Sequence, residues 1–370
     1  MIHLLADHNL YKIKELVPSS VKLSLYNPAC GLPDLTGYDA LFVRTVTQIN
    51  EQTIPSIPKS LQFIATGSSG TDHLDNDYLQ SQGITLANAN GCNARAVAEY
   101  VITALLLWKV KYHQSRSIGT VGVIGIGKTG SAVINLLSKF DINTIQYDPP
   151  REERDPDFKS ATLEEVLNCD ILTFHVPLHK QNPHSTYHWL NEHKLSRHRY
   201  QLIINAARGG VIDEMALMKH FVKGTIQNYV LDVWENEPDF NSYVAKNAFI
   251  ATPHIAGYSE QAKVNATRII CEKMATFFGL NYTKMQRYQD SKKINLKDNS
   301  TDLTQIIRQL NPILDYQNAL ENTFHDPQKM NTFQNIRNNF PYRFEYPSLS
   351  IPKKFIEQFT VLKKLGIKAS

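Results

Sequence analysis

One glycine-rich turn restricts the possible folds of this 370-residue chain more than any other feature. In TVGVIGIGKTGSAVINLL, Gly125, Gly127 and Gly130 have the spacing G-x-G-x-x-G, after a strand-like apolar run and before a helix-like pattern. In that setting the first glycine makes a tight turn, the second lets the backbone approach a pyrophosphate, and the third lets the helix pack on the strand. The free N–H groups at the helix start would bind the anion. The turn therefore predicts a Rossmann-type dinucleotide-binding domain.

The acid that follows the turn bears on which dinucleotide is bound. Asp148 ends the next strand-like run, NTIQYD, 18 residues beyond Gly130, where a carboxylate can bind the ribose hydroxyls of NAD. The same negative charge would repel the 2′-phosphate of NADP, so we expect NAD as the cofactor. Arg151, close by, leaves NADP open, because a nearby arginine is how the 2′-phosphate is accommodated.

Two blocks of strand-like runs alternate with helical or turn segments, which is typical of parallel α/β units. A long amphipathic helix is predicted between them, over residues 94–113. The expected strands are HLLAD (3–7), VKLSL (21–25), ALFV (40–43), QFIA (62–65), ITLA (84–87), TVGVIG (120–125), NTIQYD (143–148), DILTFHV (170–176), QLIINAA (201–207), YVLDVW (229–234) and AFIATP (248–253). The polar run 286–302 is interpreted as a linker.

Composition excludes several classes of protein. With 39 Lys+Arg, 35 Asp+Glu and 42% hydrophobic residues, the chain is typical of a soluble globular protein, and we expect no binding to nucleic acid. No apolar run approaches the roughly 20 residues of a membrane-spanning helix, and the N-terminus lacks the basic region of a signal peptide. The four cysteines are widely separated and show no zinc-binding spacing. We therefore expect a reduced, cytoplasmic protein with no membrane contact and no metal site.

The net positive charge lies in the C-terminal tail. Residues 286–370 hold 13 Lys+Arg and 8 Asp+Glu, whereas the rest of the chain holds 26 and 27. Such a mixed tail is more often a solvated surface than a site for an acidic partner or a phosphate, although both interpretations stay open.

Three candidate reactive residues follow successive strand-like runs of the second block: Arg208, Glu237 and His254. Ligands of open α/β sheets bind beyond the carboxyl ends of the strands, so these side chains can reach one crevice. His254 can take a hydroxyl proton as hydride leaves for the nicotinamide, Glu237 can orient the imidazole, and Arg208 can hold a substrate carboxylate bidentately. Alone, each could be a surface or turn residue. Asp232 is interpreted either as a buried structural carboxylate or as a contact to the nicotinamide carboxamide.

Four segments that contain these residues resemble the D-isomer-specific 2-hydroxyacid dehydrogenase family: GVIGIGKTG, INAARGGVIDE, LDVWENEP and TPHIAGYS. The resemblance implies that Arg208, Glu237 and His254 are catalytic and that Asp232 lies beside the nicotinamide. It also implies an α/β fold in which a Rossmann-type NAD-binding domain, residues 94–257, is inserted into a discontinuous flavodoxin-like substrate domain. That substrate domain would comprise residues 1–93 and 258–285, and residues 286–370 would form a small α+β dimerisation domain.

Further motifs resemble one branch of that family, which oxidises the 2-hydroxyl of 4-phosphoerythronate with NAD. They are ADHN (6–9), VRTVTQIN (43–50), TGSSGTDHLD (66–75), NANGCNARAVAEYV (88–101) and YDPPR (147–151). The branch implies a homodimer and a small phosphorylated 2-hydroxy acid as substrate, bound by Thr45, Thr66 and Tyr258. The implied cofactor contacts are Gly125, Ile126, Gly127, Gly130, Asp148, Val176, Ala206, Ala207, Asp232 and Gly257. Thr45 stands where the branch more often has Ser, and Val176 where it more often has Thr.

The substrate phosphate requires cations, and Arg44 is one candidate. Arg343, reaching across a dimer, is a second, with a surface ion pair as the alternative. Two other enzymes of the family share the NAD site and the three catalytic residues and stay open as alternatives: 3-phosphoglycerate dehydrogenase and glyoxylate/hydroxypyruvate reductase. An NAD-responsive binding protein on the same fold is a further alternative, because fold alone does not determine function.

Overall fold

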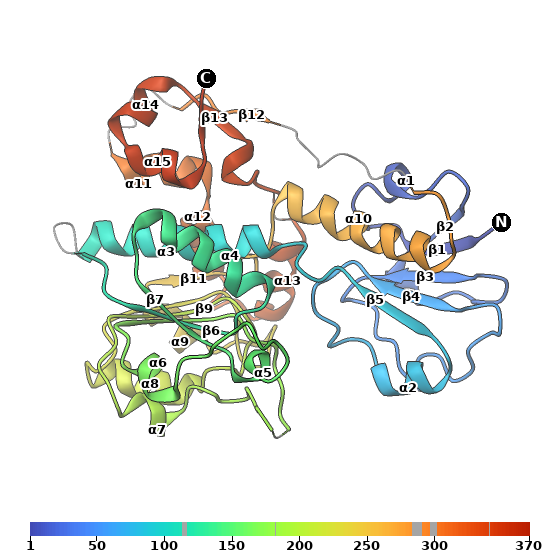
Figure 1. Ribbon diagram of the computed structural model, residues 1–370, viewed down its shortest axis with the longest axis horizontal. Coiled ribbons are helices and arrows are strands. Elements are labelled where there is room, and N and C mark those ends of the chain that lie inside the picture. The colour runs from blue at the N-terminus through green and yellow to red at the C-terminus, as the bar shows by residue number, and fades with distance from the viewer. Residues whose placement is uncertain (113–116, 182, 283–290, 297–301, 340) are drawn as a thin grey trace. The chain divides into compact units, whose positions relative to one another are not determined.

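The structure is a computed structural model that describes residues 1–112, 117–181, 183–282, 291–296, 302–339 and 341–370 (Figure 1). The chain forms two compact units, one of Met1–Asn93 with Ser259–Asp290 and one of Ala94–Tyr258 with Ser291–Ser370. The C-terminal segment thus groups with the second unit, and its separation as a third domain stays a prediction. Most of the predicted linker, 286–302, lies outside the described residues.

The first unit contains a five-stranded parallel sheet of order β2-β1-β3-β4-β5. This is the flavodoxin-like arrangement, as expected. The strands are β1 (His3–Asp7), β2 (Lys22–Tyr26), β3 (Ala40–Val43), β4 (Phe63–Thr66) and β5 (Thr85–Asn88), and the helices are α1 (Ile13–Leu16), η1 (Pro28–Cys30), α2 (Asn76–Ser81) and α10 (Glu260–Phe277). All five strands predicted in this block are confirmed within one or two residues.

The apolar runs of this sheet follow from burial on both faces. Leu4 belongs to a buried cluster that includes residues of α1 and α10, whereas its neighbour Leu5 belongs to a cluster that includes Leu79 of α2. Ile270 and Met274 of α10 are fully buried in the first of these clusters. Helix α10 thus covers one face of the sheet, which explains why the chain after residue 258 belongs to this unit.

The second unit contains a six-stranded parallel sheet of order β11-β10-β9-β8-β6-β7. Its strands are β6 (Val121–Ile124), β7 (Thr144–Tyr147), β8 (Ile171–Phe174), β9 (Leu202–Asn205), β10 (Tyr229–Leu231) and β11 (Ile250–Ala251). The helices of this part are α3 (Ala94–Tyr112), α4 (Lys128–Leu137), η2 (Ser138–Phe140), α5 (Pro149–Glu152), α6 (Leu163–Leu167), α7 (Glu192–Leu195), α8 (Glu214–Val222) and α9 (Ser242–Asn247). After β7 the chain crosses to the other side of β6, so the strand order reverses between β6 and β8, where ligands of such sheets bind.

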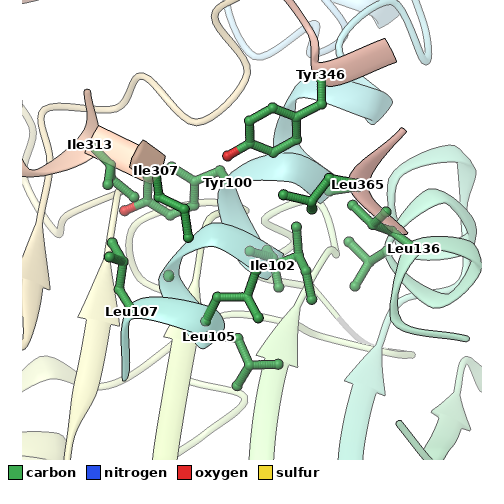
Figure 2. Close-up of a cluster of buried hydrophobic side chains, with 14 of the residues drawn as sticks. Tyr100, Ile102, Leu105, Leu107, Leu136, Ile307, Ile313, Tyr346 and Leu365 are labelled. Carbon is green, nitrogen blue, oxygen red and sulfur yellow. The ribbon is translucent and has the colours of Figure 1, made fainter. Parts of the chain in front are cut away.

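Helix α3 differs from its predicted amphipathic character, because it is buried from Ala96 to Trp108. Figure 1 shows α3 and α4 on one face of the sheet and α6, α7 and α8 on the other. The C-terminal segment covers the side of α3 that would otherwise be solvated, and Figure 2 shows Tyr346 and Leu365 directed toward this helix. The hydroxyl groups of Thr103 and Tyr346 lie 2.6 Å apart, which satisfies a polar group of α3 in this apolar setting.

The C-terminal segment is a small α+β arrangement, as expected. Its parallel sheet has the order β12-β13-β14. The elements are β12 (Lys292–Lys293), α11 (Leu303–Leu310), α12 (Ile313–Glu321), α13 (Lys329–Asn338), η3 (Tyr346–Ser348), β13 (Leu349–Ile351), α14 (Lys353–Gln358), α15 (Thr360–Leu365) and β14 (Lys368–Ala369). Among the helices described for this chain, none combines the length and apolar character needed to cross a membrane.

Candidate active site

The glycine turn joins the end of β6 to the start of α4. Gly125 has φ +89°, in the left-handed region that favours glycine, and a Cβ at Gly130 would overlap the carbonyl oxygen of Gly125. At Gly127, by contrast, a Cβ would meet no atom within 4 Å. Among the residues that the structure describes, no side chain caps the N-terminus of α4, so its first N–H groups keep their capacity to bind an anion. This open cradle fits the pyrophosphate of a dinucleotide.

Asp148 and Arg151 hold the turn in place. Asp148 accepts hydrogen bonds from the N–H groups of Ile126 (2.7 Å) and Arg151 (3.0 Å). The Arg151 guanidinium donates to the carbonyl of Ile126 (2.9 Å), pairs with Asp155 (2.9 Å) and lies 4.3 Å from the ring centroid of Phe158. Because these partners occupy the guanidinium, the arrangement favours NAD over NADP. A contact between Asp148 and the ribose stays a prediction.

Other predicted cofactor contacts lie at the carboxyl ends of neighbouring strands. Val176 follows β8, and its Cγ1 would lie 2.7 Å from a Cβ at Gly125, which places it against the turn. Ala206 and Ala207 follow β9, where the N–H of Ala207 donates to the side chain of Asn205 (3.1 Å). Gly257 lies in the loop after β11, three residues beyond His254. Their contact with NAD stays a prediction.

His254 and Glu237 form a direct pair. Nδ1 of His254 lies 2.7 Å from Oε2 of Glu237, whose Oε1 accepts the backbone N–H of Trp234 (2.8 Å). A carboxylate at this position requires the proton on Nδ1, which leaves a lone pair on Nε2. The imidazole, at 31% side-chain exposure, is therefore arranged to accept a proton from a ligand.

The environment of Glu237 keeps its carboxyl group ionised. Burial acts to raise the pKa of Glu237, but the charge and hydrogen bond of His254 and the charge of Arg337 hold that pKa below its usual range. An ionised Glu237 is the form that can stabilise a protonated His254, and the part of this pair in catalysis stays a prediction.

Asp232 fixes the loop that carries His254. Its carboxylate accepts hydrogen bonds from the Thr252 hydroxyl (2.6 Å) and from the N–H groups of Ile255 (2.8 Å) and Ala256 (2.9 Å). Its carbonyl accepts the N–H of His254 (2.7 Å), which has φ +58°. Burial raises the pKa of Asp232, although these hydrogen bonds act in the opposite direction. The geometry agrees with a structural carboxylate, and a contact with the nicotinamide stays a prediction.

Arg208 lies in the loop after β9, and its Nη1 donates to the carbonyl of Ala207 (2.8 Å). A Cβ at the adjacent Gly209 would overlap the carbonyl oxygen of Trp234, so this loop packs directly on the loop that carries Glu237. Strands β9, β10 and β11 are neighbours in the sheet. The structure thus brings Arg208, Glu237 and His254 to one edge, as the sequence predicted, while their roles stay predictions.

The predicted substrate residues have different surroundings. In the first unit Thr45 is exposed after β3, whereas Thr66 is fully buried, with its hydroxyl 3.0 Å from that of Ser68 and 2.9 Å from Nε2 of His73. Burial lowers the pKa of His73 to about 4, so this ring is neutral. In the second unit Tyr258 packs edge to face on Tyr342, with ring centroids 6.4 Å apart. Their contact with substrate stays a prediction.

Of the two candidate phosphate-binding arginines, only Arg44 keeps an exposed part. Its Nε pairs with the buried Asp7 (2.9 Å) and its side chain is 31% exposed. The prediction for Arg343 is wrong in both forms, because this side chain is buried within its own unit. Its Nη1 lies 2.6 Å from Glu99 of α3, and its Nη2 donates to the carbonyl of Ala96 (2.9 Å). Sequence patterns do not indicate this pairing, because 244 residues separate the partners.

Among the described residues, His188, Asp213 and Glu235 bring donor atoms within 4.8 Å of one another. Nε2 of His188 already lies 2.9 Å from Glu235, so an ion pair accounts for the contact between these two residues. Nothing else at this group points to a metal.

Comparison with known proteins identifies the family. Residues 107–256 match the family described as "D-isomer specific 2-hydroxyacid dehydrogenase, NAD binding domain". The chain is 35% identical to the erythronate-4-phosphate dehydrogenase of Bacteroides thetaiotaomicron, over 94% of this chain and 98% of that protein. It is 34% identical to the enzyme of the same name from Legionella pneumophila, over 93% of this chain and 95% of that protein.

A solved structure supports the fold. The cofactor (NAD+) bound 3-phosphoglycerate dehydrogenase of Entamoeba histolytica has a TM-score of 0.61 at 20% identity, covering 77% of this chain and 99% of that one. The family match confirms NAD as the cofactor, and the relatives confirm the branch that the N-terminal motifs indicated. The chain belongs to the erythronate-4-phosphate dehydrogenases, an NAD-dependent branch of the D-isomer-specific 2-hydroxyacid dehydrogenase family.

Proposed function

We propose that this protein oxidises the 2-hydroxyl of 4-phospho-D-erythronate with NAD, giving (R)-3-hydroxy-2-oxo-4-phosphooxybutanoate in the biosynthesis of pyridoxal 5′-phosphate (vitamin B6). The observation that supports the substrate best is the 35% identity to an erythronate-4-phosphate dehydrogenase over 98% of that protein's length. The observation that supports the chemistry is the 2.7 Å contact between His254 and Glu237, at the same sheet edge as the glycine turn.

His254 acts as the base in this proposal. Bound NAD would supply the acceptor for the hydride that leaves C2 of the substrate. Nε2 of His254 takes the proton of the 2-hydroxyl, and the resulting imidazolium keeps its Nδ1–H directed at Glu237. The ionised Glu237 stabilises that cation and fixes the ring, while Asp232 fixes the loop on which the ring is carried.

Arg208 and the first unit bind the two anionic ends of the substrate. Arg208 holds the C1 carboxylate and polarises the forming carbonyl, for which its planar guanidinium is suited. Thr45 and the exposed part of Arg44 bind the phosphate, which carries about two negative charges. Thr66 and Tyr258 complete the substrate contacts that the family resemblance implies.

The proposal is tested by NADH formation with 4-phosphoerythronate, 3-phosphoglycerate and D-glycerate. We expect the highest kcat/KM for 4-phosphoerythronate, and a loss on the order of 10²- to 10⁴-fold in His254→Ala, as is typical for removal of a general base. Preference for 3-phosphoglycerate would overturn the substrate assignment. Activity retained by His254→Ala would overturn the role of His254.

We further propose a cytoplasmic homodimer. All four cysteines are free thiols and three of them are buried, which suits a reducing compartment. The C-terminal segment supplies the dimer contact by analogy with the family. Light scattering of the purified chain should give twice the monomer mass of 42.1 kDa, and a monomer would refute the assembly.

A further inference from the structure

Helix α13 of the C-terminal segment docks on the loop that follows Glu237. Nζ of Lys329 donates to the carbonyl of Phe240 (2.8 Å) and pairs with Asp239 (2.8 Å). One turn later, the ring of Phe333 packs on that of Phe240, with centroids 5.4 Å apart. Residues four apart lie on one face of a helix, so Arg337 is the third residue on this docked face.

The guanidinium of Arg337 is partly buried, and contacts within its own helix do not satisfy it. Its Nε is buried and has no hydrogen-bond partner among the residues that the structure describes. An unpaired buried donor costs free energy, because it has given up its hydrogen bonds to water. The charge of Arg337 acts on Glu237, and contributes to holding the pKa of that carboxyl below its usual range.

The C-terminal segment also contacts the loop that carries His254. Tyr342, five residues beyond Arg337, packs on Tyr258, which lies four residues after His254. The segment therefore borders the loops that carry both members of the catalytic pair, and residue 337 stands between these two contacts in the sequence.

We propose that Arg337 is a positioning residue for the Glu237–His254 pair, supplied by the C-terminal segment. Its positive charge keeps Glu237 an ionised acceptor for the Nδ1–H of His254. The same charge disfavours the imidazolium, so Arg337 limits how strongly Glu237 stabilises it. The inference rests on the proposed dehydrogenase reaction.

The other groups that act on Glu237 define the controls. His254 and the N–H of Trp234 contact its carboxylate directly. Glu214 at the start of α8 is coupled to it as well, and burial raises the pKa of Glu214 to about 7. Because Glu214 titrates in the working range, each measurement is made in the natural chain and in a Glu214→Gln background.

The experiment is the pH profile of kcat/KM for Arg337→Met, Arg337→Lys and Lys329→Met. In Arg337→Met we expect the acid limb to move to higher pH by about half to one unit, the scale of one partly buried charge interaction. Arg337→Lys restores the charge and should restore the profile. Lys329→Met is the matched control on the same helix face, and it should lower Tm without moving the limb.

An acid limb unchanged in Arg337→Met would overturn the proposal, as would an equal displacement in Arg337→Lys. If Arg337→Met does not fold, Arg337→Gln is held to the same criterion. The ring resonances of His254, titrated by NMR in the holoenzyme with NAD and without substrate, provide a second readout. Their midpoint should rise in Arg337→Met, whichever hydroxy acid is the substrate, so failure of this inference is distinct from failure of the substrate assignment.

Discussion

At the scale of residues, the ionisation of Glu237 affects the stability of the fold and, in the proposed mechanism, the activity as well. Its pKa is lower in the folded chain than in an unfolded one, so the ionised group stabilises the fold above the ordinary carboxyl pKa. That contribution is lost as the pH falls through the lowered pKa. Glu237 is stabilised in its ionised form by its interactions with His254 and with Arg337. In our proposal, Glu237 stabilises the imidazolium of His254, whereas Arg337 destabilises it.

Glu237→Gln removes the negative charge while keeping the size of the side chain. We expect kcat/KM to fall by about 10²-fold or more, because the imidazolium loses its partner and the ring loses its fixed tautomer. The acid limb of the pH profile should move to lower pH, opposite in sign to Arg337→Met. Steady-state kinetics between pH 5 and 9 check both statements, and a limb displaced upward would contradict the assigned geometry.

Candidate site residues that directly follow strands could be predicted from the sequence. Residues that influence those side chains from another part of the chain could not. Arg208, Glu237 and His254 could be predicted because parallel strands deliver their carboxyl ends to one edge. Arg337 could not, since nothing in its own helix indicates that the docked face meets Phe240. The pairing of Asp232 with the loop 252–256 likewise depends on backbone geometry that no spacing encodes.

At the scale of elements, the glycine turn places different demands on its glycines. Gly130 is needed for close packing of α4 on β6, whereas Gly127 faces open space and has φ −76°, which any residue adopts. Gly130 therefore serves the fold, and Gly127 leaves space for the ligand.

Gly130→Ala and Gly127→Ala should separate these two demands. We expect Gly130→Ala to lower the free energy of unfolding by about 1–3 kcal/mol, as overpacking does. Gly127→Ala should leave Tm nearly unchanged and weaken NAD binding, because its methyl group occupies the space in front of α4. Thermal melts and calorimetric titration with NAD measure the two effects, and a large loss of Tm in Gly127→Ala would argue against the open cradle.

Helix α3 shows why the period of apolar residues is an incomplete guide. Its apolar positions predicted one buried stripe, yet Glu99 and Thr103 on the remaining face are buried too. Both are satisfied by residues more than 240 positions away, Arg343 and Tyr346. A polar residue in a helix pattern indicates exposure only when no distant segment brings it a partner.

At the scale of the whole molecule, the C-terminal segment is integral to the second unit. Arg343 and Glu99 form a buried ion pair, with side-chain exposures of 5% and 0%. Glu99 also accepts the N–H of Tyr346 (3.0 Å) and pairs with Arg95 (2.7 Å). The segment is thus fastened to α3 by charge as well as by apolar packing.

Arg343→Met should destabilise the protein by about 3–5 kcal/mol, because it leaves a buried carboxylate without its closest charge partner. The double variant Arg343→Met with Glu99→Leu should recover part of this loss, since neither charge is then buried. Urea unfolding of the three chains measures the coupling. A single variant as stable as the natural chain would show that Arg343 is not needed to hold the segment.

The order of the two α/β blocks could be predicted from sequence because each strand has an uninterrupted apolar run between turn signals. The tail could not be predicted in detail, since its charges are mixed and its short elements are stabilised by residues of α3 and of the loop after Glu237. The site residues that follow strands of the sheet could therefore be predicted, whereas Arg337, which the tail supplies, could not.

In the proposed reaction, hydride leaves C2 of the substrate for NAD while His254 takes the hydroxyl proton. The most direct test uses 4-phosphoerythronate carrying deuterium at C2, with mass spectrometry of the reduced cofactor. We expect one deuterium per NADH formed by the natural chain, and formation of labelled NADH slower by on the order of 10²- to 10⁴-fold in His254→Ala. Deuterium found in the solvent instead of the cofactor would contradict hydride transfer.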